Sequence, residues 1–146
     1  NKRKPTMTAP KPIKVQKYAH YKKALICVDA EGNEYNVGPT THAIIQFANR
    51  YQHIDPLFTP LNEKQIENKI REIFNKGSLS TDEMFHRRNA KREQTRAKNV
   101  IWWVSGDVNF IVNLKERTII TAELTGEHIN YNNTPPRVPY QMYVEK

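Results

Sequence analysis

The chain has 146 residues, 38 % of them hydrophobic, and a formal net charge of +8. This size and composition predict one domain with a modest core. No stretch approaches the roughly 20 apolar residues of a transmembrane helix, and Cys27, the only cysteine, cannot form an internal disulfide. We therefore expect no membrane-spanning segment, and a domain that works where thiols stay reduced.

The positive charge is concentrated at the start of the chain. Residues 1–23 hold eight of the 23 Lys and Arg residues and no acid, so residues 24–146 carry 15 basic residues against 15 acidic ones. Prolines at positions 5, 10 and 12 disfavour a helix there. We predict a flexible basic leader over residues 1–23 and a single α+β domain over residues 24–146. The leader favours a polyanionic partner such as nucleic acid, although a solvated linker explains it equally well.

The body of the chain begins with a predicted hairpin and a helix. Leu25–Asp29 and Glu34–Val37 flank a turn that contains Gly and Asn, which favours two short antiparallel strands. The segment that Pro39 opens has apolar residues at helical spacing, namely Ile44, Phe47, Ala48 and Tyr51. These residues predict a helix with one buried face.

A second helix is predicted to begin at Asn62, with Gln65 completing a capping box, and to stop at Gly77. Residues 87–98 predict a third helix, too polar to be buried, with six Lys or Arg and one acid. This basic helix suits a phosphate backbone, and a solvated helix is the equally good alternative. The buried face of the second helix consists of Ile66, Ile70, Ile73 and Phe74.

Three antiparallel strands are predicted in the last third of the chain, over Val100–Val104, Val108–Asn113 and Thr118–Leu124. Their apolar centres lack a clean alternation, so helices are expected to pack on them. The neighbours Trp102 and Trp103 should point to opposite faces. The proline-containing tail predicts an irregular strap. The fold class is thus α+β, with an N-terminal hairpin and helices packed on a C-terminal antiparallel β-sheet.

A polar seam runs along the predicted first helix, opposite its apolar stripe. It consists of His42, Gln46, Asn49 and His53, with Arg50 beside it. His42 could exchange a proton near neutral pH and Arg50 could clamp a phosphate. The alternative is an ordinary solvated helix face.

On the last strand, Thr118 and Thr121 are three residues apart and should face opposite sides of the sheet. Thr121 is the better candidate because it lies within an apolar run, although β-propensity also explains a threonine there. The histidines lack the spacing of a zinc site, and the sequence has no GxxxxGK[ST], GxGxxG or GxSxG motif. We therefore expect no metal and no cofactor.

In order, these features resemble a known family. Thr41-His42-Ala43 opens a helix that carries Arg50, Asn75-Lys76-Gly77 ends a capped helix, and Ile119-Ile120-Thr121 lies in a terminal sheet. Over roughly residues 25–125, the pattern resembles the barnase/EndoU/colicin/RelE superfamily of small metal-independent ribonucleases. The resemblance is to the toxin domains of contact-dependent growth inhibition and other polymorphic toxin proteins in particular. By position it implies a catalytic set of His42, Arg50 and Thr121. The RNA-binding candidates are Arg87, Arg88, Arg92, Lys115 and Arg117.

The implied reaction is RNA cleavage without a metal. His42 takes the proton of a ribose 2′-hydroxyl, which attacks the adjacent phosphorus and leaves a 2′,3′-cyclic phosphate. Arg50 neutralises the charge that develops at phosphorus, and Thr121 donates a hydrogen bond to a non-bridging oxygen. The general acid is unassigned, with His86 and Lys115 as candidates.

The resemblance also implies a setting. Such a domain is secreted or surface-delivered as part of a larger protein, which the start at Asn1 suits. It acts in the target-cell cytoplasm on RNA, with tRNA as one candidate, and is neutralised by a cognate immunity protein. Two other functions stay open from the sequence. One is a non-catalytic basic nucleic-acid-binding module, and the other is an interaction domain that docks on an acidic protein.

Overall fold

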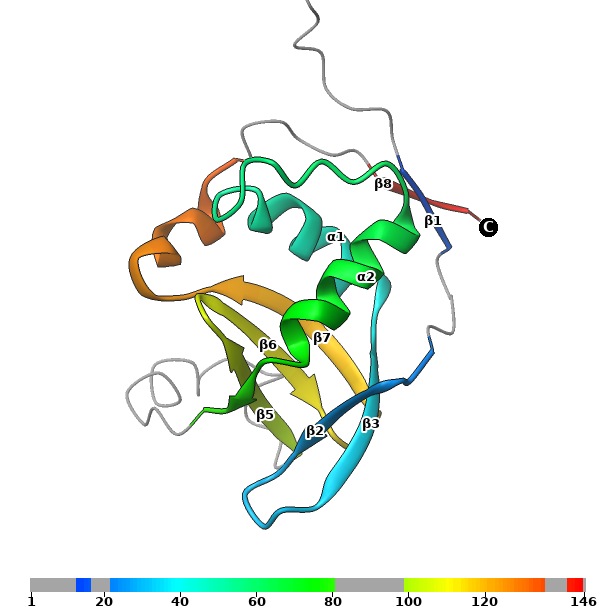
Figure 1. Cartoon of the computed structure of the whole chain (residues 1–146). Helices are drawn as coiled ribbons and strands as arrows, with labels where there is room; N and C mark the ends of the chain where they lie inside the picture. Colours follow the sequence, from blue (N-terminus) through cyan, green and yellow to red (C-terminus); the bar gives the residue numbers. More distant parts are fainter. Residues whose placement is uncertain (1–12, 17–21, 81–98, 136–141, 146) are drawn as a thin grey trace, which may run out of the picture.

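The computed structural model describes residues 13–16, 22–80, 99–135 and 142–145. Within these ranges the chain forms helices and a six-stranded mixed sheet, so the predicted α+β class is confirmed (Figure 1). The elements in chain order are β1 (Ile13–Gln16), β2 (Leu25–Val28), β3 (Glu34–Pro39), α1 (Thr41–Tyr51), α2 (Glu63–Phe74), β4 (Ser78–Leu79), β5 (Val100–Ser105), β6 (Val108–Asn113), β7 (Thr118–Leu124), the 3₁₀ helix η2 (Gly126–Asn133) and β8 (Met142–Glu145).

The large sheet is continuous from the hairpin to the later strands. Its order is β2-β3-β7-β6-β5-β4, and β5, β6 and β7 are antiparallel neighbours. The hairpin β2–β3 joins them edge to edge, because β3 pairs in parallel with β7 through Gly38↔Thr118 and Pro39↔Ile119. The hairpin therefore extends the sheet instead of packing on it, which makes the sheet mixed.

Both helices begin at side chains that cap them. Thr40 Oγ1 accepts a hydrogen bond from Ala43 N at 3.0 Å, and Asn62 Oδ1 accepts one from Gln65 N at 2.9 Å. Gln65 Oε1 in turn accepts from Leu61 N at 2.7 Å, which completes a reciprocal cap one residue earlier than the predicted box. The predicted apolar stripes are buried, with Tyr51 partly so: Ile44, Phe47, Ala48, Ile66, Ile70, Ile73 and Phe74.

The two helices cover one face of the sheet, which we call the inner face, and the opposite face is the outer face. Trp103 packs in the main core with the helices, and its Nε1 donates to Phe74 O at 2.9 Å. Trp102 belongs to a smaller cluster with Val100 and Ile111 on the outer face. The prediction that the two tryptophans face opposite sides is confirmed, and both are buried.

A β-bulge changes the face of the threonines on β7. Ile111 pairs with Thr121 and Asn113 pairs with Thr118, which leaves Ile120 as the extra residue on β7. Ile111 and Asn113 are two residues apart on β6 and share a face. Thr118 and Thr121 therefore both lie on the outer face, and the expectation that they face opposite sides is wrong because of the bulge.

Part of the predicted basic leader has regular structure. β1 pairs in parallel with β8, in a register that runs from Ile13↔Met142 to Gln16↔Glu145. The β-branched Ile13 and Val15 favour a strand once the prolines of the leader have ended. The predicted basic helix over residues 87–98 lies outside the described residues. In the described ranges no helix has the length and hydropathy that a membrane crossing requires.

Asn109 on the outer face provides a test of the packing. It is fully buried, and neither atom of its side-chain amide has a hydrogen-bond partner among the described residues. Because an unpaired buried amide costs about 1–3 kcal/mol, Asn109→Leu should raise the free energy of unfolding by about 1 kcal/mol in urea denaturation. Asn113→Leu is the control and should lower it, because Asn113 Oδ1 accepts from Glu116 N at 3.0 Å. A destabilised Asn109→Leu would contradict this description.

Candidate functional site

The three residues predicted as catalytic lie on two sides of the sheet. His42 is exposed in the first turn of α1, and Arg50 lies in the last turn of the same helix. Thr121 is buried on the outer face, which α1 does not cover. The sheet therefore separates the Thr121 side chain from His42 and Arg50, and the three do not come together.

Arg50 binds backbone carbonyl groups. Its Nη1 donates to Ala122 O at 2.7 Å and its Nη2 donates to Asn132 O at 3.2 Å. These bonds connect α1 to β7 and to η2, so the guanidinium positions these elements. Partial burial lowers the pKa of His42, and the positive charge of Arg50 lowers it further. The His42 ring is therefore neutral at neutral pH.

Lys115 and Arg117, the predicted phosphate contacts, lie in the turn between β6 and β7. Lys23 Nζ donates to Glu116 O at 3.3 Å, which brings the end of the predicted leader to this turn. Arg117 has a left-handed backbone with φ of 58°, an unfavourable conformation for a residue other than glycine. Its guanidinium carbon lies 5.6 Å from the centroid of the Tyr35 ring. The turn thus holds basic side chains close together.

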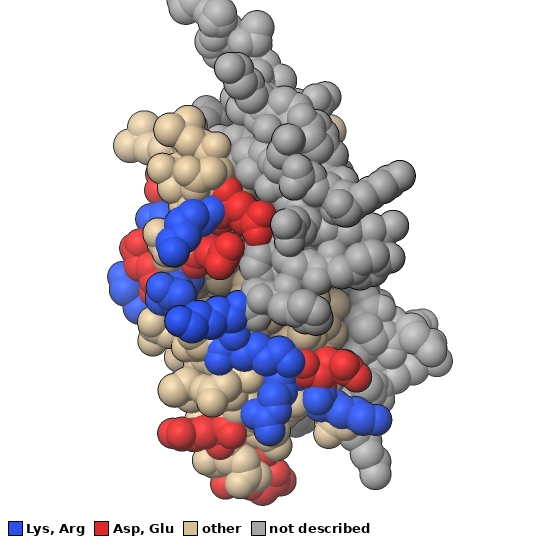
Figure 2. All heavy atoms as spheres, turned by 90° about the vertical axis from the view of Figure 1, so that its right-hand side faces the viewer, with Lys and Arg blue, Asp and Glu red and all other residues tan. Residues whose placement is uncertain are grey.

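We call Lys22, Lys23, Lys115 and Arg117 the basic surface. Figure 2 shows Lys and Arg side chains in a band across the face that Figure 1 presents on its right-hand side, with Asp and Glu side chains at its borders. Such a band attracts polyanions over about 10 Å at moderate ionic strength. The other three RNA-binding candidates, Arg87, Arg88 and Arg92, lie outside the described residues.

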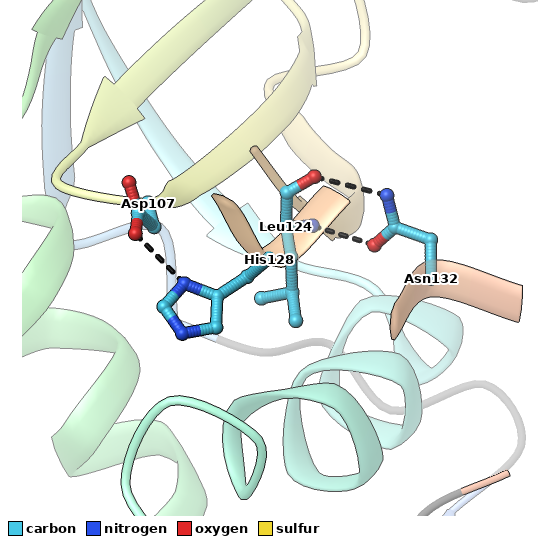
Figure 3. A network of polar contacts seen from close by, with 4 residues as sticks. All are labelled: Asp107, Leu124, His128 and Asn132. Carbon is cyan, nitrogen blue, oxygen red and sulfur yellow. Dashed lines mark hydrogen bonds and ion pairs between the residues drawn. The ribbon is translucent and has the colours of Figure 1, made fainter. Parts of the chain in front are cut away.

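An aspartate and a histidine that the sequence analysis did not single out form a close pair. Nδ1 of His128 on η2 lies 2.8 Å from Oδ2 of Asp107, which precedes β6 (Figure 3). Because a carboxylate accepts hydrogen bonds, the neutral ring carries its proton on Nδ1 and leaves the lone pair on Nε2. The side chain of His128 is 21 % exposed. The pair therefore has the form of a base that a carboxylate orients.

Gly126 makes this pair possible. It adopts a left-handed backbone with φ of 61°, which turns the chain back after β7. A Cβ atom at this position would lie 2.7 Å from Oδ1 of Asp107, closer than real Cβ contacts allow. Thr125 N also donates to Asp107 O at 2.8 Å. The backbone of η2 thus approaches Asp107 closely enough for His128 to reach it.

A second contact holds the far end of η2. Asn132 Oδ1 accepts from Leu124 N at 2.6 Å, and Asn132 Nδ2 donates to Leu124 O at 2.9 Å (Figure 3). The side-chain amide thereby acts like a neighbouring strand at the end of β7. Because Arg50 binds the carbonyl of the same asparagine, η2 is fixed at both ends.

One member of the pair, Asp107, lines a cavity of about 350 Å³. Tyr51 is the last residue of α1, Lys76 follows α2, and Ser105 is the last residue of β5; all three line the cavity. Burial raises the pKa of Tyr51, so its phenol stays protonated at neutral pH. The lining brings an ammonium group and two hydroxyls to the cavity that the carboxylate of Asp107 also borders. These groups are suited to general acid–base chemistry on an anionic substrate.

The same region offers ligands for a cation. Asp107, Glu127 and His128 each bring one ligand atom to within 4.8 Å of the others. Carboxylate oxygens and imidazole nitrogens are common zinc ligands. However, Nδ1 of His128 already donates to Asp107, so the contacts favour a hydrogen-bonded pair over a set of metal ligands.

Comparisons of the chain with protein-family models, with curated proteins and with solved structures find no match. The resemblance to small ribonucleases therefore rests on the sequence features alone. What the structure adds is an α+β fold with an Asp–His pair at one end of its sheet.

The sequence contains partial signals for this site. A Ser-Gly-Asp turn between two predicted strands and a glycine two residues after the last strand mark both chain segments. The pairing itself depends on how η2 folds back over 21 residues of sequence, which no local pattern encodes.

The His42 ring provides a test of the electrostatics of α1. We expect its pKa, followed by NMR, to lie below 6.5, the usual value for histidine. Arg50→Gln should raise this pKa only in part, because the burial remains, whereas Arg50→Lys keeps the charge and should leave it low. A pKa at or above 6.5 in the wild type would contradict the lowering by burial and by the positive charge.

Gly126 provides a test of the Asp107–His128 geometry. Gly126→Ala and Gly106→Ala both place alanine at a positive φ, and each should lose about 1 kcal/mol of stability. Gly106 is the control, because a Cβ there meets no atom within 4 Å. Only Gly126→Ala should also displace Asp107, and ¹⁵N NMR should then show His128 losing its preference for a proton on Nδ1. Equal behaviour of the two variants would contradict the close approach.

Proposed function

We propose that this chain is a metal-independent ribonuclease domain that cleaves RNA at the cavity beside Asp107 and His128. The observation that carries the proposal is the 2.8 Å contact of His128 with Asp107, because Asp107 and Lys76 line the same cavity. The net charge of +8 supports an anionic macromolecule as the substrate. The resemblance of the sequence to small ribonucleases supports the reaction type.

In the proposed reaction, Nε2 of His128 takes the proton from a ribose 2′-hydroxyl. The 2′-oxygen then forms a bond to phosphorus, and the bond from phosphorus to the 5′-oxygen breaks, which leaves a 2′,3′-cyclic phosphate. Tyr51 donates its proton to the departing 5′-oxygen, and proton exchange with solvent restores the phenol and the neutral ring. Lys76 offsets the negative charge that develops on the phosphoryl oxygens. Asp107 holds the ring in place through its contact with Nδ1.

In this proposal the basic surface binds the part of the RNA strand that lies away from the cleavage site. It lies at the opposite end of β6 from the Asp107 turn, and six residues of strand span about 20 Å. A single strand of several nucleotides can cover this distance. The proposal keeps the setting that the resemblance implies: delivery to a target cell as part of a larger protein, with a cognate immunity protein as partner.

The full chain should be incubated with total bacterial RNA in excess EDTA, and the products separated on a denaturing gel. Discrete fragments are expected with the wild type, and His128→Ala should cleave about 10²- to 10⁴-fold more slowly. Asp107→Asn should also lose rate, because its amide no longer orients the ring in the same tautomer. Glu127→Gln is the matched control and should cleave at the wild-type rate.

Two other outcomes would overturn parts of this proposal. Intact RNA with the wild type would contradict cleavage and favour the non-catalytic nucleic-acid-binding module. A full rate in His128→Ala together with a loss in His42→Ala would move the reaction to His42 on α1.

A further inference from the structure

An aromatic side chain lies directly beside the Asp107–His128 pair. Tyr131 follows His128 by three residues on η2, and side chains at this spacing lie on the same side of a 3₁₀ helix. The centroids of the two rings are 6.1 Å apart, with an angle of 35° between the planes. Tyr131 is thus the nearest aromatic ring to His128 among the described contacts.

The ring of Tyr131 is held in place by a second histidine. His53, just after α1, stacks on it with the centroids 4.4 Å apart and the planes within 9°. Despite this contact Tyr131 remains 40 % exposed. A flat ring that is fixed on one side and partly open to solvent differs from a core residue, because part of its apolar surface is uncovered.

Next to this ring is a second cavity of about 320 Å³. Its lining is made of His53 and Tyr131 together with Gln52, Pro56, Thr134 and Pro135. None of these side chains is an acid, so the cavity does not repel an anionic ligand. Flat rings and prolines favour a planar ligand that stacks.

We propose that this second cavity is a nucleobase subsite, in which a base of single-stranded RNA stacks on Tyr131 while its phosphate lies near His128. The proposal deepens the ribonuclease function and rests on it for the phosphate position. A separation of 6.1 Å between the two rings is short enough for one nucleotide to contact both. Stacking on an aromatic ring accepts any base, because every base has a π-face.

The test is a titration of the full chain with adenosine 5′-monophosphate, followed by NMR, with ribose 5-phosphate as the probe that lacks a base. In the wild type we expect the ring resonances of Tyr131 and His53 to shift, and adenosine 5′-monophosphate to bind at least about tenfold more tightly than ribose 5-phosphate. Tyr131→Phe keeps the ring and should keep this difference. Tyr131→Ala and Tyr131→Leu should abolish it.

Unchanged Tyr131 and His53 resonances in the wild type would overturn the subsite, whether or not the alanine variant folds. Equal affinity of the wild type and a folded Tyr131→Leu for adenosine 5′-monophosphate would do the same and would mean that Tyr131 only anchors η2. Cleavage of RNA by the wild type with no base-dependent binding would leave the ribonuclease proposal in place and remove the subsite. Base-dependent binding at Tyr131 without RNA cleavage would leave the subsite and remove the ribonuclease.

Discussion

The attachment of α1 to β7 is the constraint on which the candidate site depends. At the start of the helix, Thr40 Oγ1 donates to the carbonyls of Ile119 and Ile120, both at 3.1 Å. At its end, Arg50 donates to Ala122 O at 2.7 Å. Apolar side chains between these two points fill the inner face of the sheet. These contacts therefore fix the position of α1 along β7, and with it the position of Tyr51 in the lining of the cavity.

The same attachment determines where η2 lies. The guanidinium of Arg50 binds one carbonyl on β7 and the carbonyl of Asn132. The side-chain amide of Asn132 binds both the backbone N–H and the carbonyl of Leu124. The chain after β7 is thereby folded back over the end of the sheet. Gly126 supplies the turn and the free space that this path requires. The contact between Asp107 and His128 follows from this path, because these hydrogen bonds bring the segment of His128 to the turn that holds Asp107.

Much of the fold could be predicted from the sequence, because its signals are local. The cap at Asn62 and the spacing of Ile66, Ile70 and Ile73 define α2 without any knowledge of its neighbours. The strands β5, β6 and β7 likewise follow from β-branched and aromatic runs between turns. The parallel pairing of β3 with β7 could not be predicted in this way, since it joins residues about 80 positions apart. It forms through backbone N–H and C=O groups, which occur in every sequence.

The candidate site could be predicted less well, for a physical reason. One extra residue at Ile120 changes the face on which Thr121 lies, and nothing in the apolar run of β7 indicates the bulge. Arg50 was a reasonable phosphate ligand by residue type, but its guanidinium binds two carbonyls that only the tertiary fold brings near it. His128 lacks a recognisable motif, because it lies on η2 and its partner Asp107 lies in the turn between β5 and β6. The side chains of the candidate site are brought together by the fold and not by their spacing in the sequence.

The most direct test of this account is the structure of the full chain bound to a short RNA that cannot be cleaved because its 2′-hydroxyl groups are replaced by hydrogen. The account predicts a phosphate within hydrogen-bonding distance of Nε2 of His128 and Nζ of Lys76. An RNA bound across Thr121 on the outer face, or a phosphate held by His42 with the Asp107 cavity empty, would contradict it.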